Sequence, residues 1–184
     1  NAGSSGEFRE GKGTVWEGGV REPCVMRWPG KIPAGTVCKT PAMNIDLLPT
    51  IAKLIDADLP ERKIDGKDIW PILAGEEGAE NPHDAYWFYY KSNELQAVQS
   101  GEWKLILPHT YRTVPEGLQG DGGLPVKYDN LKTEMELYHL ALDSSETNDV
   151  AKDYPEKVAA LMKHAEAARA ELGDRLTKSE GAGN

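Results

Sequence analysis

A glycine-rich segment near the start of the chain carries the side chains best suited to chemistry. Residues 11–23 read GKGTVWEGGVREP, with Lys12 between two glycines and with Glu17 and Arg21 downstream. Glycine lets the backbone adopt left-handed conformations and approach a ligand closely. A lysine held between glycines presents its ammonium group as a point charge. The segment therefore predicts an anion-binding site centred on Lys12.

A nucleotide-binding loop is the first alternative for this segment. Gly6, Gly11 and Lys12 have the spacing of a P-loop, but Gly13 stands where that motif has serine or threonine. No strand pattern precedes the segment and no helix pattern follows it. The residues thus argue against a phosphate cradle, and the net charge of −9 argues against a nucleic-acid partner.

Other residues capable of chemistry are scattered. The histidines have no partners at metal-ligand spacing and stand at positions 83, 109, 139 and 164. Of these, His109 follows a predicted hairpin and precedes Arg112, where imidazole and guanidinium could contact an anionic or sugar-like substrate. An exposed loop histidine is the equal alternative. Residues 143–149 are acidic but lack the central glycine of a calcium-binding EF-hand loop.

The first group of elements expected to position these residues is short. Residues 24–28 form an apolar run bounded by prolines, which predicts a buried strand, and Cys24 within it is expected to be a buried structural thiol. Apolar residues spaced by three and four after Asp46 predict a helix with one apolar face. Asn44 or Asp46 could cap that helix. Residues 65–73 predict a short helix or turn.

The second group of elements reads as antiparallel strands and one long helix. Strands are predicted at 86–90 and 136–140, a hairpin from 95–99 and 103–107, and a helix over 155–172 that ends at Gly173. Residues 108–133 show no periodicity and predict a long connection, which inside a compact domain is usually functional or mobile. The order of elements predicts the tail of an α/β domain, residues 1–80, followed by a small α+β subdomain, residues 81–184.

Several stretches together resemble the second half of a type I, arylsulfatase-like sulfatase of the alkaline-phosphatase-like superfamily. They are residues 11–23 and 27–35, 46–50 and 64–73, and 101–105 with 136–140 and 143–146. The resemblance implies hydrolysis of sulfate esters, with Lys12 binding the substrate sulfate. A fixed cation there would stabilise the charge that builds up on the sulfate oxygens. Glu17 and Arg21 are then expected to order the loop that holds Lys12, and His109 and Arg112 to line a possible substrate pocket.

The nucleophile and metal ligands of the family are not matched here. The family makes its formylglycine from the cysteine of Cys-x-Pro-Ser-Arg, whereas Cys24 stands in CVMR and Cys38 in CKTP. The calcium ligands of the family lie upstream of the glycine-lysine motif. Calcium and formylglycine are therefore expected in a full-length parent enzyme. No catalytic residue, metal ligand or cofactor is expected in this chain, which should be inactive by itself.

The resemblance also implies partners and a location. The expected partners are a sulfated small molecule or glycan and the missing N-terminal part of the same enzyme, in the periplasm or outside the cell. No apolar run approaches transmembrane length, so no membrane partner is expected. The edge of the strand at 24–28 would be exposed, which predicts self-association through that edge and disorder or rearrangement of residues 1–21.

Two other functions fit the same residues. One is a related phosphatase, phosphodiesterase or phosphonate hydrolase of the same superfamily, which the sequence upstream would distinguish. The other is a non-catalytic module that binds sulfated glycans, which would retain binding without hydrolysis.

Overall fold

The computed structural model of the chain describes residues 4–118 and 126–183. Contacts divide the chain into two compact units. The first unit joins Asn1–Glu22 to Ala85–Asn184, and the second is Pro23–Asp84. The predicted division into 1–80 and 81–184 concerns the domains of a whole sulfatase and stays a prediction.

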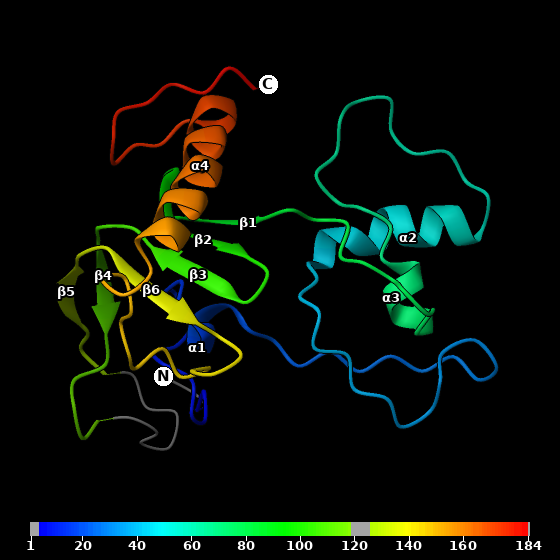
Figure 1. The fold of residues 1–184 in the computed structure, drawn as a ribbon, viewed down its shortest axis with the longest axis horizontal. Helices are drawn as coiled ribbons and strands as arrows, with labels where there is room; N and C mark the ends of the chain where they lie inside the picture. Colours follow the sequence, from blue (N-terminus) through cyan, green and yellow to red (C-terminus); the bar gives the residue numbers. More distant parts are fainter. Residues whose placement is uncertain (1–3, 119–125, 184) are drawn as a thin grey trace. The chain divides into compact units, whose positions relative to one another are not determined.

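A four-stranded antiparallel sheet forms the centre of the first unit (Figure 1). Its order is β1-β2-β3-β6, and the strands are β1 (Tyr86–Tyr90), β2 (Glu94–Ser100), β3 (Trp103–Ile106) and β6 (Glu136–His139). Ser100 pairs with Trp103 across a tight turn, where Gly101 has a φ of 55°. That left-handed conformation is the one that two-residue hairpin turns demand. The predicted hairpin and the predicted strands on either side of it are confirmed.

The long C-terminal helix packs against this sheet. Helix α4 (Pro155–Leu172) contacts β2 and β3, as Figure 1 shows. One face of the helix, with Leu161, Ala165 and Ala168, is buried against the leucines and valine of the strands. Gly173 ends the helix with a φ of 77°. The predicted helix over 155–172 is confirmed, together with the fold class of a small antiparallel sheet packed by a C-terminal helix.

A second, two-stranded sheet occupies part of the segment predicted as a connection. Strands β4 (His109–Thr113) and β5 (Asp129–Thr133) pair antiparallel, so the prediction of an unstructured connection over 108–133 is wrong at both ends. The strands read HTYRT and DNLKT. Because most of their side chains are polar, the apolar alternation that identifies a half-buried strand is missing. Residues 119–125, also part of that prediction, lie outside the described residues.

The second unit is helical where it is regular. It contains the 3₁₀ turn η1 (Asn44–Asp46), α2 (Leu47–Leu54) and α3 (Trp70–Ala74), which confirms the predicted helix and short helical turn. Asp46 does not cap α2 through its side chain. Its buried carboxylate instead accepts hydrogen bonds from the N–H groups of Met43, at 2.8 Å, and Lys67, at 2.9 Å. The apolar face of α2 is exposed, with Leu48 at 54% and Ile51 at 53%.

The strand predicted at residues 24–28 is not formed. Residues 21–28 adopt neither helix nor strand, Val25 is 95% exposed, and Cys24 is exposed rather than buried. An isolated strand is not stable without a neighbour to satisfy its backbone groups. Nothing within 23–84, all of which is described, pairs with these residues. The exposed strand edge from which self-association was predicted is therefore absent.

Among the helices of residues 4–118 and 126–183, none combines the length and the apolar character needed to cross a membrane.

Candidate functional site

The segment predicted to bind an anion is folded onto the main sheet through Trp16. The indole is 0% exposed and packs with Ala97, Ile106 and Tyr111. The Arg9 guanidinium lies over its ring at 4.6 Å. The helical turn α1 (Glu17–Val20) follows directly. The prediction that residues 1–21 are disordered is thus wrong for the described residues 4–21, because a buried indole ties them to the strands, and the alternative that they are rearranged stays a prediction.

Lys12 lies at the exposed tip of this segment. Gly13 has a φ of 98°, and the Thr14 hydroxyl donates to the carbonyl of Gly11 at 2.9 Å. No ion pair joins Lys12 to a residue of the described ranges. A tight turn with its own internal hydrogen bond therefore carries a lysine side chain that is open to solvent and to a ligand.

Arg112 lies beside the same turn. Its guanidinium donates to the carbonyl oxygen of Lys12 at 3.1 Å and stacks over the Tyr128 ring at 4.7 Å. A Cβ on Gly13 would clash with this guanidinium, so the Arg112 contact as seen here needs glycine at this position. The positive φ of Gly13 favours glycine for a second reason. The structure thus brings Arg112, predicted from the sequence as a possible substrate contact, to the backbone of Lys12.

His109 is buried beneath the segment. It belongs to β4 rather than to a loop, is 2% exposed, and its ring lies 5.5 Å from that of Trp16. Its Nδ1 lies 2.6 Å from the carbonyl oxygen of Leu107, which can only accept, so Nδ1 carries the proton. Burial lowers the pKa of His109. The predicted loop histidine is therefore an interior imidazole that supports Trp16.

Glu17, predicted together with Arg21 to order the loop, pairs with Arg21 and with Lys104, and that loop-ordering role stays a prediction. The Glu17 carboxylate lies 2.9 Å from the Lys104 ammonium and 3.7 Å from the Arg21 guanidinium. Lys104 is also 3.0 Å from the Glu146 carboxylate, which accepts the Glu17 N–H at 2.6 Å. Sequence reasoning missed Lys104 and Glu146. The available signal was a lysine inside the apolar run WKLIL.

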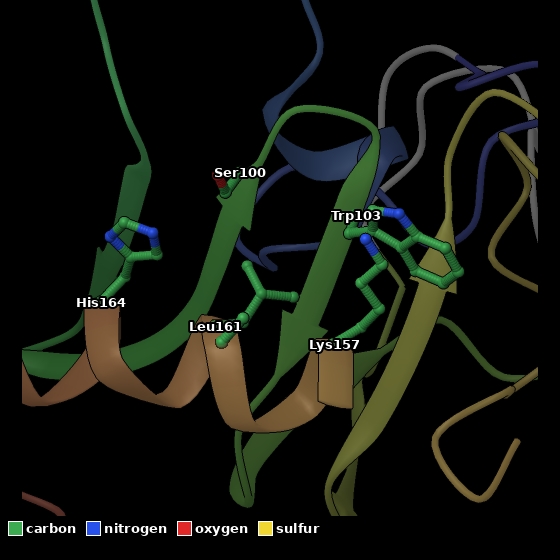
Figure 2. Close-up of a pocket in the computed structure, with 6 residues that line it drawn as sticks. Ser100, Trp103, Lys157, Leu161 and His164 are labelled. Atoms are coloured by element: carbon green, nitrogen blue, oxygen red, sulfur yellow. The ribbon is translucent and has the colours of Figure 1, made fainter. Parts of the chain in front are cut away.

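A separate hollow of about 120 Å³ lies between α4 and the β2–β3 hairpin (Figure 2). Figure 2 shows Lys157, Leu161 and His164 on the helix facing Trp103 and Ser100 of the hairpin. None of the residues predicted from the sequence to bind substrate lines it. The hollow is therefore not the site around Lys12.

The calcium and formylglycine implied by the resemblance do not fit the residues described here. Cys24 and Cys38 are exposed and lack the flanking proline, serine and arginine of the formylglycine motif. In the described part of the chain, no group of three or more histidine, cysteine or acidic residues is arranged to hold a metal.

Comparison with known proteins decides the family. Residues 6–171 match the family model described as N-sulphoglucosamine sulphohydrolase, C-terminal. The chain belongs to this family. Its relatives include human arylsulfatase A, 35% identical over 189 residues, a match that covers 95% of this chain and 35% of that protein. Mouse steryl-sulfatase is 42% identical over 123 residues, covering 64% of this chain and 19% of that protein.

The fold of this chain is also similar to that of solved structures. One is a protein described within the metabolism of multiple glycosaminoglycans by Bacteroides thetaiotaomicron, with a TM-score of 0.65 and 28% identity. The match covers 89% of this chain and 32% of that one. The chain spans about a third of these relatives or less, and the matching family model is that of a C-terminal region. The predicted resemblance to the second half of a sulfatase is confirmed.

Proposed function

We propose that this chain acts as the C-terminal part of an enzyme that hydrolyses sulfate esters, and that Lys12 binds the sulfate group. The observation that carries the proposal is the exposed Lys12 on a turn whose base is anchored by the buried Trp16. Trp16 anchors the backbone of the turn, so the flexible Lys12 side chain extends toward an anion from a defined position. A charged group already positioned in the protein stabilises the transition state better than water does, because water dipoles must first reorient.

The chemistry assigned to Lys12 follows from charge. Cleavage of a sulfate ester builds negative charge on the sulfate and leaving-group oxygens, and an adjacent ammonium stabilises that charge. Arg112 is proposed to hold the turn through the Lys12 carbonyl and to shape the side where the leaving group lies. His109 is proposed to support the Lys12 turn indirectly, because its ring packs against that of Trp16. The nucleophile is proposed to come from the remainder of the enzyme.

The proposed partners are a sulfated small molecule or glycan and the remainder of a sulfatase domain. The exposed apolar face of α2, with Leu48 and Ile51, supports the second partner, because an apolar helix face is usually covered in a complete domain. The periplasmic or extracellular location stays a prediction, as do calcium and formylglycine in the parent enzyme.

The proposal is tested by titrating sodium sulfate into the ¹⁵N-labelled chain at constant ionic strength. Saturable shifts are expected at the amides of Gly11, Gly13 and Thr14. They should disappear in Lys12→Ala and persist in Lys163→Ala, which removes an exposed lysine from α4. Equal sulfate shifts in wild type and Lys12→Ala would contradict the assignment.

A further inference from the structure

A buried cluster of three charged side chains joins the Lys12 segment to the rest of its unit. Lys104 on β3 and Glu146 in the turn before α4 are each 0% exposed, and Glu17 at the start of α1 is 7% exposed. The Lys104 ammonium lies 2.9 Å from one Glu17 oxygen and 3.0 Å from one Glu146 oxygen. One lysine therefore bridges two carboxylates that come from distant parts of the sequence.

Glu17 is held through its backbone as well as its side chain. Its N–H, which has no partner within the short helix, donates to the Glu146 carboxylate at 2.6 Å. Bonds of this kind to an ionised acceptor are about twice as strong as neutral ones. The two contacts fix both the position and the orientation of the first residue of α1.

The fixed start of α1 sets the turn that carries Lys12. The Gly18 N–H donates to the Arg9 carbonyl at 2.9 Å. A Cβ on Gly19 would clash with the carbonyl and hydroxyl oxygens of Thr14 and with the Gly11 carbonyl. The backbone of α1 is thus packed directly against both ends of the turn around Lys12, so a displacement of Glu17 would be passed to that turn.

The turn that holds Glu146 is itself braced. Glu146 has a φ of 52°, a left-handed conformation that costs a non-glycine residue about 1 kcal/mol or more. The Asp143 carboxylate accepts the N–H groups of Thr147, at 2.9 Å, and Asn148, at 2.8 Å. Arg9 donates to the Glu146 carbonyl at 3.2 Å. This bracing holds the Glu146 carboxylate in place against an unfavourable backbone conformation.

A buried ionic cluster is a costly way to gain stability, because apolar residues of similar volume often do as well or better. Burial also raises the pKa of Glu146, an effect that Lys104 opposes. Unlike apolar packing, the ion pairs and hydrogen bonds of the cluster fix the orientation of Glu17. We propose that Lys104 and Glu146 are positioning residues that hold Glu17, and through it the turn that presents Lys12 to sulfate. This inference rests on the proposed function of Lys12.

The test compares Lys104→Met and Glu146→Gln with Arg169→Met in the full chain. Arg169 makes a comparable ion pair in the same unit, 3.0 Å from the buried Asp174. Hydrogen exchange of the Glu17, Gly18 and Gly19 amides is measured against the amides of β2 and β3, and sulfate affinity is measured by the titration above.

The two cluster variants are expected to speed exchange at residues 17–19 at least tenfold relative to the strands. They should also weaken sulfate binding about tenfold, which corresponds to about 1.4 kcal/mol. Arg169→Met should leave both the exchange ratio and the sulfate affinity unchanged, even if it lowers the stability of the unit. Lys104→Arg, which keeps the charge, should restore part of the slow exchange.

Equal acceleration at residues 17–19 and in the strands would overturn the proposal, because the cluster would then only stabilise the unit as a whole. If Lys104→Met does not fold, Glu146→Gln decides by the same criterion. Selective loosening of residues 17–19 in a chain whose sulfate affinity does not depend on Lys12 would support the positioning role and reject the proposed function of Lys12.

Discussion

Replacement of Trp16 by alanine tests whether the glycine-lysine segment is an integral part of the first unit. The indole is 0% exposed and contacts Tyr111 at 4.3 Å between ring centres. Truncation of a buried tryptophan to alanine costs about 3–5 kcal/mol through lost burial and the cavity that remains. Loss of the Arg9 contact, at 4.6 Å, adds about 0.5–1 kcal/mol. The expected loss in the free energy of unfolding is therefore about 3.5–6 kcal/mol.

That loss is a large part of the 5–15 kcal/mol typical of a folded domain. It is measured by urea unfolding, followed by far-ultraviolet circular dichroism for the sheet and α4. Trp28→Ala is the matched control, because Trp28 lies in the other unit and is 44% exposed. It should cost less than about 1 kcal/mol. A loss below about 1 kcal/mol for Trp16→Ala would refute the argument that the buried indole anchors the segment.

Three further predictions concern other parts of the chain. Burial lowers the pKa of His109, so on acidification the unfolded state takes up a proton before the folded state does. The free energy of unfolding should therefore fall as the pH drops below about 6.5. In urea unfolding midpoints measured against pH, His109→Gln should reduce this dependence on pH. Ile51→Glu on the exposed face of α2 should change the free energy of unfolding by less than about 0.5 kcal/mol. A larger loss would mean that the apolar face of α2 is buried in the isolated chain. The purified chain should not hydrolyse an aryl sulfate, and clear turnover would show that it holds a nucleophile.

Elements with strong local patterns could be predicted from the sequence. The hairpin around Gly101 and the helix over 155–172 each combine an apolar period with a residue suited to ending the element. The motif around Lys12 also identified the family without any three-dimensional information. These features depend on neighbours in sequence, which is the information that a single chain displays directly.

Features that depend on distant partners could not be predicted in the same way. The apolar run at 24–28 has a strand-like sequence but no strand beside it, so it stays irregular with Val25 exposed. Strands β4 and β5 pair through backbone hydrogen bonds and carry few apolar side chains. The partner of Glu17 is Lys104 rather than Lys12, because the fold brings β3 under α1. No spacing in the sequence shows that juxtaposition.

The role of Lys12 in binding sulfate is tested most directly by the rate of aryl sulfate hydrolysis by a sulfatase that carries this chain as its C-terminal part. We expect Lys12→Ala to lower kcat/KM by about 100-fold or more, as is found when one stabilising group is removed from a charged transition state. Lys163→Ala should leave kcat/KM unchanged. A Lys12→Ala enzyme with kcat/KM within about twofold of wild type, about 0.4 kcal/mol, would contradict the assignment of Lys12 to the sulfate.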